Sequence, residues 1–254
     1  MKVTFLGTGT SQGVPIITCS CEVCTSVDYR DKRLRTSIHI ETDDHQSIVI
    51  DTGPDFRQQM LQAHIKQLDA VVFTHPHKDH TAGLDDIRAF YFAQGMQPMP
   101  VYCNQLVEKQ LRSEFNYFFE EHKYPGVPSV DLHEIQANQP FKIGETLFQP
   151  IEVIHGKMPV LGFRINDFTY ITDANYIAPE QKEKIKGSKV LVLNALRHEP
   201  HYSHFTLKEA LGIIEEVQPE KAYLTHISHG LGLHKEVSQM LPENVYLAYD
   251  GLKI

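Results

Sequence analysis

The 254-residue sequence lacks any apolar run that approaches the roughly 20 residues needed to cross a lipid bilayer. Its first residues, Met1 to Gly7, pass directly into a strand-like run. They lack the basic start, apolar middle and small-residue cleavage site of a secretory signal peptide. These absences predict a cytoplasmic protein that has no membrane-spanning segment.

Basic charge is also scarce, because 24 Lys and Arg residues face 32 Asp and Glu residues and leave a net charge of −8. A negative chain has no general attraction to polyanions, so non-specific binding to nucleic acid is not expected. One local basic cluster, at Arg30, Lys32, Arg33 and Arg35, is interpreted as a solvated turn. A single arginine of this cluster, Arg33 or Arg35, is a candidate contact for an anionic substrate.

Cysteine is limited to four residues, and three of them fall within six positions, at Cys19, Cys21 and Cys24. An odd trio in a cytosolic protein argues against a disulfide framework and indicates a metal site that lacks one ligand. The surrounding segment shows no helical or strand periodicity, which predicts a loop that a metal orders. Cys103 stands alone after an apolar pair and is predicted to be a buried core residue.

Histidine, by contrast, is abundant, with 15 residues, and it clusters after the apolar run Ala70–Phe73. Four residues that can bind a metal lie within six positions there: His75, His77, Asp79 and His80. Imidazole and carboxylate suit zinc, and manganese accepts them as well. In an extended segment, residues two apart point the same way, so His80 is expected to turn to the opposite side. The predicted arrangement is one ion held by His75 and His77 and a second ion held by Asp79 and His80.

The rest of the chain alternates short strands and helices without a linker, a low-complexity tract or a repeat, which predicts a single domain over residues 1–254. Strands are expected at residues 3–6, 36–42, 47–50, 68–73, 101–102, 146–148, 151–154, 161–165, 168–172, 189–193, 221–224 and 246–251. Helices are expected near 56–61, at 83–90, from the cap Asn104 to 115, and from the capping box at Thr206 to about 217. Residues 118–138 are interpreted as a loop or a flap over the site.

Polar side chains recur where the predicted strands end, at Asp51, His155, Asp173 and His226. Loops carried by rigid strands can bring such distant positions together. Counting ligands predicts two ions, one held by His75, His77 and His155 and the other by Asp79, His80 and His226, with Asp173 bridging them. Such a pair makes hydroxide available near neutral pH. Asp51 is expected to orient a ligand or to form a turn.

The run His75-Pro76-His77-Lys78-Asp79-His80 matches the HxHxDH motif of the metallo-β-lactamase superfamily. The strand-end aspartate Asp51 and the later ligands follow in the order that the superfamily shows. The resemblance covers nearly the whole chain. It implies an α/β layered fold, the four-layer αββα sandwich, with the metals at one edge.

Within the superfamily, the chain resembles the PhnP branch of phosphodiesterases, through Gly7-Thr8-Gly9, the cysteine trio and Thr225-His226-Ile227-Ser228-His229. This resemblance implies a structural zinc, in a loop at about 15–30, held by Cys19, Cys21, Cys24 and His229. His234 is the alternative fourth ligand. His204 matches a histidine that the branch places beside the reacting phosphate, and His201 competes for that role. The family also suggests a homodimer.

These observations predict a metal-dependent phosphodiesterase with Asp79 and His204 as catalytic residues. Its expected substrates are small or cyclic phosphodiesters or nucleotides, attacked by a hydroxide that two divalent ions, Mn²⁺ or Zn²⁺, hold between them. The alternatives are a lactone or thioester hydrolase, an RNA 3′-processing endonuclease, and a non-enzymatic metal-binding or cofactor-assembly protein. A redox di-iron protein is disfavoured, because those relatives carry glutamate where this chain has His77.

Overall fold

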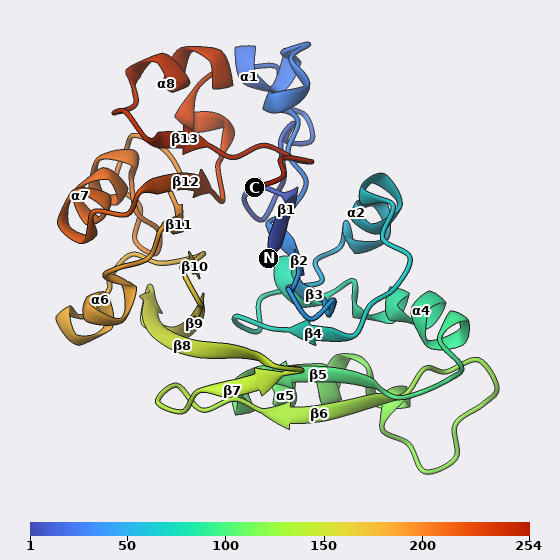
Figure 1. Ribbon diagram of the computed structural model, residues 1–254. Coiled ribbons are helices and arrows are strands. Elements are labelled where there is room, and N and C mark those ends of the chain that lie inside the picture. The colour runs from blue at the N-terminus through green and yellow to red at the C-terminus, as the bar shows by residue number, and fades with distance from the viewer.

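The computed structural model describes residues 1–254, and its strands form two sheets (Figure 1). The first sheet has six strands in chain order: β1 (Lys2–Gly7), β2 (Ser37–Glu41), β3 (Ser47–Ile50), β4 (Ala70–Val72), β5 (Met99–Cys103) and β6 (Val130–Glu134). The second has seven strands in reverse chain order: β13 (Val245–Leu247), β12 (Lys221–Thr225), β11 (Val190–Asn194), β10 (Phe168–Tyr170), β9 (Met158–Ile165), β8 (Thr146–His155) and β7 (Phe141–Ile143).

Helices cover the outer face of each sheet. The first sheet carries α2 (Phe56–Ala63), α4 (Arg88–Ala93) and α5 (Gln105–Glu114). The second carries α6 (Pro179–Ile185), α7 (Leu207–Val217) and α8 (His234–Met240). The short elements are α1 (Glu22–Thr25) and α3 (Lys78–Thr81), with 3-10 turns η1 (Tyr29–Asp31), η2 (Leu84–Ile87), η3 (Asn116–Phe118) and η4 (His229–Leu231). None of these helices has the length and apolarity to span a bilayer.

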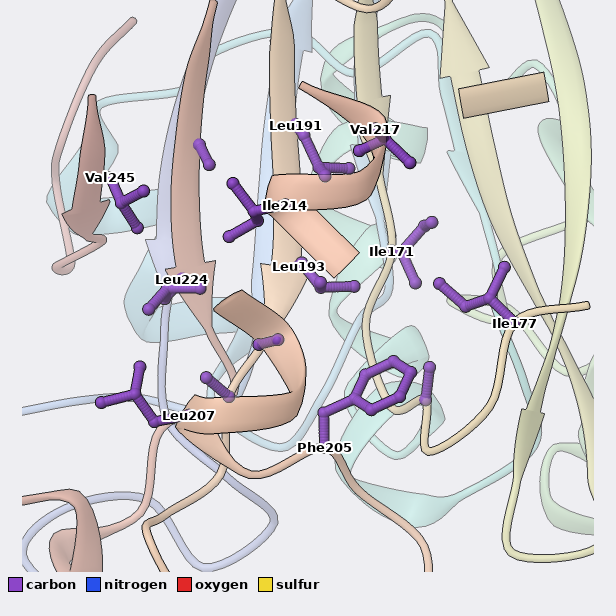
Figure 2. Close-up of a cluster of buried hydrophobic side chains, with 14 of the residues drawn as sticks. Ile171, Ile177, Leu191, Leu193, Phe205, Leu207, Ile214, Val217, Leu224 and Val245 are labelled. Atoms are coloured by element: carbon purple, nitrogen blue, oxygen red, sulfur yellow. The ribbon is translucent and has the colours of Figure 1, made fainter. Parts of the chain in front are cut away.

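Alternation of side chains along the strands builds the layers. In β4, Ala70 and Val72 point into the core between the sheets, whereas Val71 packs under the helices of the first sheet. In β11, Val192 points into the core between the sheets. Leu191 and Leu193 point the other way, toward α7, where they meet Ile214 and Val217 (Figure 2). The result is the four-layer αββα sandwich that the family resemblance implies.

Strand direction decides where the functional side chains gather. Strands β3 to β6 run parallel, and so do β10 to β13. Strand β9 is antiparallel to both β8 and β10, so β8 points the same way as β10. Loops that leave the carboxyl ends of parallel strands share one edge of a sheet, which is the usual place for a site in such folds.

Several elements differ from the sequence prediction. The single helix expected at 83–90 divides into η2 and α4, because its first turn closes with i→i+3 bonds such as that from Asp86 N to the Gly83 carbonyl. The stretch 118–138 contains β6, which pairs with β5, and Phe118 and Val127 are buried against the first sheet's helices. This segment therefore packs against the first sheet and does not cover the predicted ligands.

The inter-sheet core gives a stability test on one strand, β8, because successive residues face opposite ways. Phe148 is fully buried between the sheets and Leu147 is 46% exposed. We expect Phe148→Ala to lower the free energy of unfolding by about 3–5 kcal/mol, through lost burial and a cavity. Leu147→Ala should change it by about 0.5 kcal/mol or less. Urea unfolding of both variants measures this, and similar losses would contradict the assigned inward face.

Candidate metal centre

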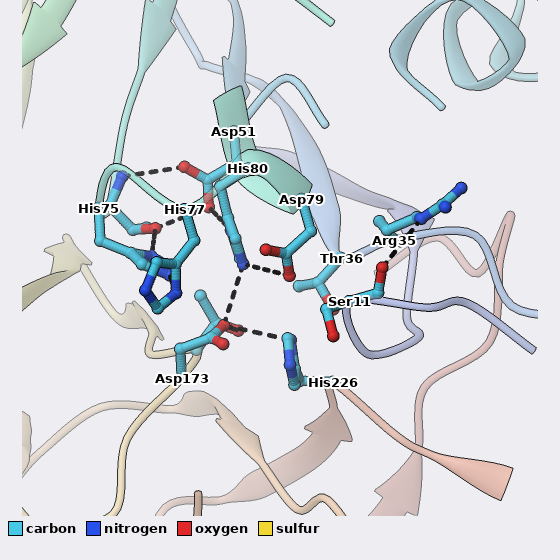
Figure 3. Close-up of polar contacts among 12 residues, drawn as sticks. Ser11, Arg35, Thr36, Asp51, His75, His77, Asp79, His80, Asp173 and His226 are labelled. Carbon is cyan, nitrogen blue, oxygen red and sulfur yellow. Dashed lines mark hydrogen bonds and ion pairs between the residues drawn. The ribbon is translucent and has the colours of Figure 1, made fainter. Parts of the chain in front are cut away.

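Metal-ligand side chains from both sheets meet at the edge where the parallel strands end (Figure 3). His75 follows β4, and the short helix α3 carries Asp79 and His80. From the second sheet, β8 ends at His155, while Asp173 lies three residues beyond β10. His226 directly follows β12. The predicted ligands therefore share one site although they span residues 75 to 226 of the chain.

The donors form two groups, within each of which the ligand atoms lie within 4.8 Å of one another. One group is His75, His77 and His155, and the other is Asp79, His80, Asp173 and His226. Asp173 also lies within this distance of His155 and His204, so its carboxylate stands between the groups. This grouping matches the one predicted from ligand counting.

The expected orientation of His80 is wrong. An extended backbone through residues 75–80 places His80 opposite Asp79, but the chain is extended only as far as His77 and then turns into helix α3. The helical turn brings both side chains to the same side, with His80 Nε2 3.2 Å from Asp79 Oδ2 and 3.3 Å from Asp173 Oδ2. Periodicity alone did not reveal this turn, because four residues are too few to show a helical pattern.

The chemistry of the donor set fits divalent cations. Carboxylate oxygens lie 3.1–3.3 Å from His80 Nε2 and His226 Nδ1 without forming a hydrogen bond of acceptable geometry, and His226 Nε2 is buried with no hydrogen-bond partner either. Leaving a buried polar atom without a hydrogen bond costs about 1–3 kcal/mol. Burial opposes a proton on His80, but Asp79, Asp173 and Asp51 outweigh it and raise the pKa of His80 well above its usual value. A cation that these donors bind would replace that proton.

Asp51 orients one ligand of each group. Its fully buried carboxylate accepts hydrogen bonds from His80 Nδ1 (2.8 Å) and from Thr74 Oγ1 (2.8 Å). Thr74 Oγ1 in turn accepts from His75 Nδ1 at 2.9 Å. Both rings thereby turn their Nε2 atoms toward the site, the role expected of Asp51. No sequence pattern singles out Thr74, although it lies between the strand and the histidine motif.

Backbone and neighbouring loops fix the ligands of the second sheet. His155 Nδ1 donates to the carbonyl of Ser203 at 2.7 Å, which leaves its Nε2 for the site. Asn194, at the end of β11, bonds to both backbone groups of Ala174 and so holds the loop after Asp173. Asp173 and His226 have φ values of 54°, a region that non-glycine residues enter rarely and often at functional sites.

A second cluster joins the cysteine trio to the loop after β12. The Sγ atoms of Cys19, Cys21 and Cys24 lie 3.3, 3.3 and 3.5 Å from His229 Nδ1. The backbone N–H of Cys24 lowers the pKa of Cys21 to about 6, whereas burial raises that of Cys24 to about 11. His234 lies elsewhere, with its Nδ1 3.3 Å from the Arg33 guanidinium. The structure therefore brings together the predicted Cys₃His set and excludes the alternative.

His204 lies beside the donors. The family resemblance favoured it over His201 for this position. It is 8% exposed, its ring centroid is 4.7 Å from that of His226, and its Nδ1 is 3.8 Å from Asp173 Oδ1. Burial, assisted by His226, lowers the pKa of His204 to about 3, so the ring is neutral near pH 7. His201 stacks on its outer side, with centroids 5.1 Å apart.

Five of the seven donors, namely His77, Asp79, His155, Asp173 and His226, line a hollow of about 250 Å³ whose lining also includes Thr10, Ser11 and Tyr202. Arg35 pairs with Asp55 at 2.8 Å and donates to the Ser11 carbonyl at 3.2 Å, so it supports the loop at the rim of the hollow (Figure 3). Arg33 is 4% exposed and bonds to the Ala248 carbonyl, away from the donors. Cys103 is buried in the core, as predicted.

Comparisons with known proteins agree with this geometry. The model of the beta-lactamase superfamily domain matches residues 46–227. A crystal structure of a diphosphatase from the PhnP family is 40% identical, with a TM-score of 0.93 over 100% of this chain and 96% of that one.

Two curated relatives extend the comparison. An octanoyltransferase of Porphyromonas gingivalis is 40% identical over 254 residues, which make up 100% of this chain and 51% of that protein. Coenzyme PQQ synthesis protein B of Methylorubrum extorquens is 32% identical over 222 residues, which are 76% of this chain and 72% of that protein. The chain thus spans about half the length of the first relative, so that protein's name does not fix the activity of the matched half.

The Asp51 contacts predict how one buried carboxylate supports metal binding. Asp51→Asn keeps the side chain's size, but both carboxylate oxygens accept hydrogen bonds here, Oδ1 from Thr74 N and Oδ2 from His80 Nδ1 and Thr74 Oγ1, and an amide nitrogen in either place cannot accept. We expect the affinity of the donor groups for Zn²⁺ to fall about 10–100-fold, measured by competition with a chelator. The matched control is Asp69→Asn, because Asp69 accepts from Ser47 N at the opposite end of the same strands. An unchanged affinity in Asp51→Asn would contradict the orienting role.

Proposed function

The chain belongs to the β-lactamase superfamily and to its PhnP-like branch, and on that premise we propose that it is a metal-dependent hydrolase of phosphate esters and anhydrides. Small phosphodiesters, cyclic phosphodiesters and nucleoside diphosphates are its candidate substrates. The observation that carries the proposal is the convergence of seven donor side chains from both sheets beside His204. The 40% identity to a PhnP-family diphosphatase supports the choice of phosphorus chemistry.

Two divalent ions, Zn²⁺ or Mn²⁺, are proposed at the donor groups, with His75, His77 and His155 on one side and Asp79, His80 and His226 on the other. Asp173 lies between the groups and would supply a carboxylate to both ions. Such ions lower the pKa of bound water and offset negative charge on phosphate oxygens. The Cys₃His cluster is the donor set of a closed structural zinc site, and we assign it that role.

Side chains that line the hollow orient the attacking water and protonate the leaving oxygen. In the hydrolysis, an oxygen from water bonds to phosphorus, the bond from phosphorus to the leaving oxygen breaks, and that oxygen takes up a proton. Asp79 faces the hollow and accepts a hydrogen bond from the attacking water, which orients it. His204 is neutral in the empty site, but an anionic phosphate beside the ring favours its charged form, so the ring takes up a proton from solvent when substrate binds and donates that proton to the leaving oxygen.

Specific observations favour two competing functions. The relationship to coenzyme PQQ synthesis protein B supports a cofactor-assembly or metal-binding role without turnover. The octanoyltransferase name of a longer relative brings acyl esters and thioesters into consideration. An RNA 3′-processing endonuclease is less well supported, since the net charge of −8 disfavours a polyanion. Each competitor differs from the main proposal in what the purified protein hydrolyses.

Metal content tests the ligand assignment without any assay of turnover. We expect elemental analysis of purified protein to find about three metal ions per chain, at least one of them zinc, from the ligand count. Cys21→Ser should remove one equivalent and leave the other two, because its cluster is separate from the donor groups. Cys103→Ser is the control, since Cys103 lies in the hydrophobic core. Retention of all metal in Cys21→Ser would contradict the assigned structural site.

Kinetics of two neighbouring histidines test the reaction. His204→Ala should lower kcat for a phosphodiester or diphosphate about 10²–10⁴-fold with unchanged metal content, because it removes the proton donor. His201→Ala should lower kcat much less, since His201 lies on the outer side of His204. A larger loss in His201→Ala would reverse the assignment.

The substrate panel decides between the functions. It holds cyclic and linear phosphodiesters, diphosphates, a lactone and a thioester, all offered to metal-loaded protein. Turnover of only the lactone or thioester would replace the phosphorus chemistry. No turnover of any compound by the metal-replete protein would favour a binding or assembly role.

A further inference from the structure

A second hollow adjoins the one above the donors. Its volume is about 360 Å³, and the two hollows share His77, His155, Tyr202 and Ser203 in their linings. The second is completed by Gly156 and Lys157, which form the turn between β8 and β9, and by Met158, the first residue of β9. The first hollow, at about 250 Å³, is below the roughly 300–1,000 Å³ of most small-molecule pockets. It suits a phosphoryl group, and the rest of a substrate must extend beyond it.

Tyr202 presents an aromatic ring where the hollows meet. It is 83% exposed, although it lies between His201 and the buried Ser203. Its ring centroid is 4.8 Å from that of His201, which stacks on His204, so aromatic rings continue from the donors to the rim. The ring lies close to the β8–β9 turn, since a Cβ built on Gly156 would be in ordinary contact with it, 3.7 Å from Tyr202 Cε2. An exposed ring of this kind is a platform on which a base can stack.

Lys157 gives the second hollow its charge. The residue is exposed in the turn after His155, and the lining of this hollow contains no carboxylate. Gly156 adopts a φ of 66°, as a two-residue hairpin turn favours, so the turn holds Lys157 next to the ligand-bearing end of β8. Met158 adds an apolar, polarisable side chain. A cation, an aromatic ring and a thioether together match an anionic group attached to a planar ring.

We propose that the second hollow is the leaving-group subsite and that it takes a nucleoside monophosphate, with its base on Tyr202 and its phosphate at Lys157. This inference rests on the proposed function and narrows the substrate to a nucleoside diphosphate. The terminal phosphorus lies in the first hollow, water adds to it, and the bond to the bridging oxygen breaks. The products are inorganic phosphate and the nucleoside monophosphate, which takes its proton from His204.

The chain contains no tryptophan, so Tyr202→Trp places a single indole at the subsite. AMP, the probe, should quench its fluorescence in metal-loaded protein by stacking on it, and ribose 5-phosphate, which has no base, should not. The control is Tyr124→Trp, because Tyr124 is 59% exposed and lines neither hollow. Quenching by AMP at position 202 but not at 124 supports the subsite. Equal quenching at both positions, or none at 202 up to millimolar AMP, overturns it.

Kinetics supply the second readout. Tyr202→Ala should raise KM for ADP about tenfold or more and leave KM for inorganic diphosphate unchanged, since the latter has no base. Tyr202→Phe should restore the wild-type value, because stacking needs the ring and not the hydroxyl. Lys157→Ala should raise KM for both diphosphates but not for a cyclic phosphodiester, which lacks the second phosphate.

The two proposals fail in different ways. Wild-type turnover of diphosphates with no effect of Tyr202→Ala or Lys157→Ala overturns the subsite and leaves the hydrolase standing. Absence of all turnover overturns the hydrolase and with it the leaving-group role, and AMP quenching then reports only whether the second hollow binds a nucleotide.

Discussion

The structure depends on the buried carboxylate of Asp173, around which the ligands of both sheets are arranged. Its Oδ2 is 3.1 Å from His226 Nδ1 and 3.3 Å from His80 Nε2, and its side chain is 2% exposed. Such a carboxylate would be unfavourable in isolation, and the neighbouring imidazoles hold its pKa well below the usual value against the effect of burial. His80 follows a strand of the first sheet, whereas Asp173 and His226 follow strands of the second. The contacts of Asp173 with His80 therefore form only when the two sheets are packed against each other. The site and the inter-sheet core therefore stabilise the same arrangement.

The convergence of the donor side chains was predictable because these residues obey two local rules. The motif at His75 to His80 concentrates donors within six residues, and Asp51, Asp173 and His226 each follow an apolar run. Strands in both sheets end at one edge, so strand-end residues meet whatever the details of packing. Side chains of Ala70, Val71 and Val72 point alternately to the two faces of β4, but all three are apolar, so the sequence does not show which face is the inner one. Only the second sheet and the helices settle that.

What the sequence did not reveal depends on loops and on very short elements. Helix α3 is four residues long, so an extended ligand segment was an equally good interpretation of the motif. Strand β6 was hidden because the apolar–polar alternation that begins at Val130 covers only four residues before Glu134 breaks it, which is too short to stand out. Tyr202 and Lys157 carry no motif, and their proximity arises only where the β8–β9 turn meets the loop before α7. Loops joined in space but distant in sequence leave no periodic signal.

The acidic balance of the chain and the proposed anionic substrate are compatible for an electrostatic reason. Asp79 and Asp173 are the carboxylates among the donor groups, and two divalent cations there would exceed their combined charge. The local field at the donors is then positive, although the net charge of the chain is −8. The second hollow adds Lys157 without an opposing carboxylate in its lining. Interactions with solvent-exposed charges farther away are screened within about 8 Å at physiological ionic strength. The binding of a small phosphate therefore depends on the positive charges next to it and not on the net charge of the chain. A long polyanion would extend beyond this range and be repelled by the net negative charge of the chain. This repulsion is the physical reason to expect a small substrate.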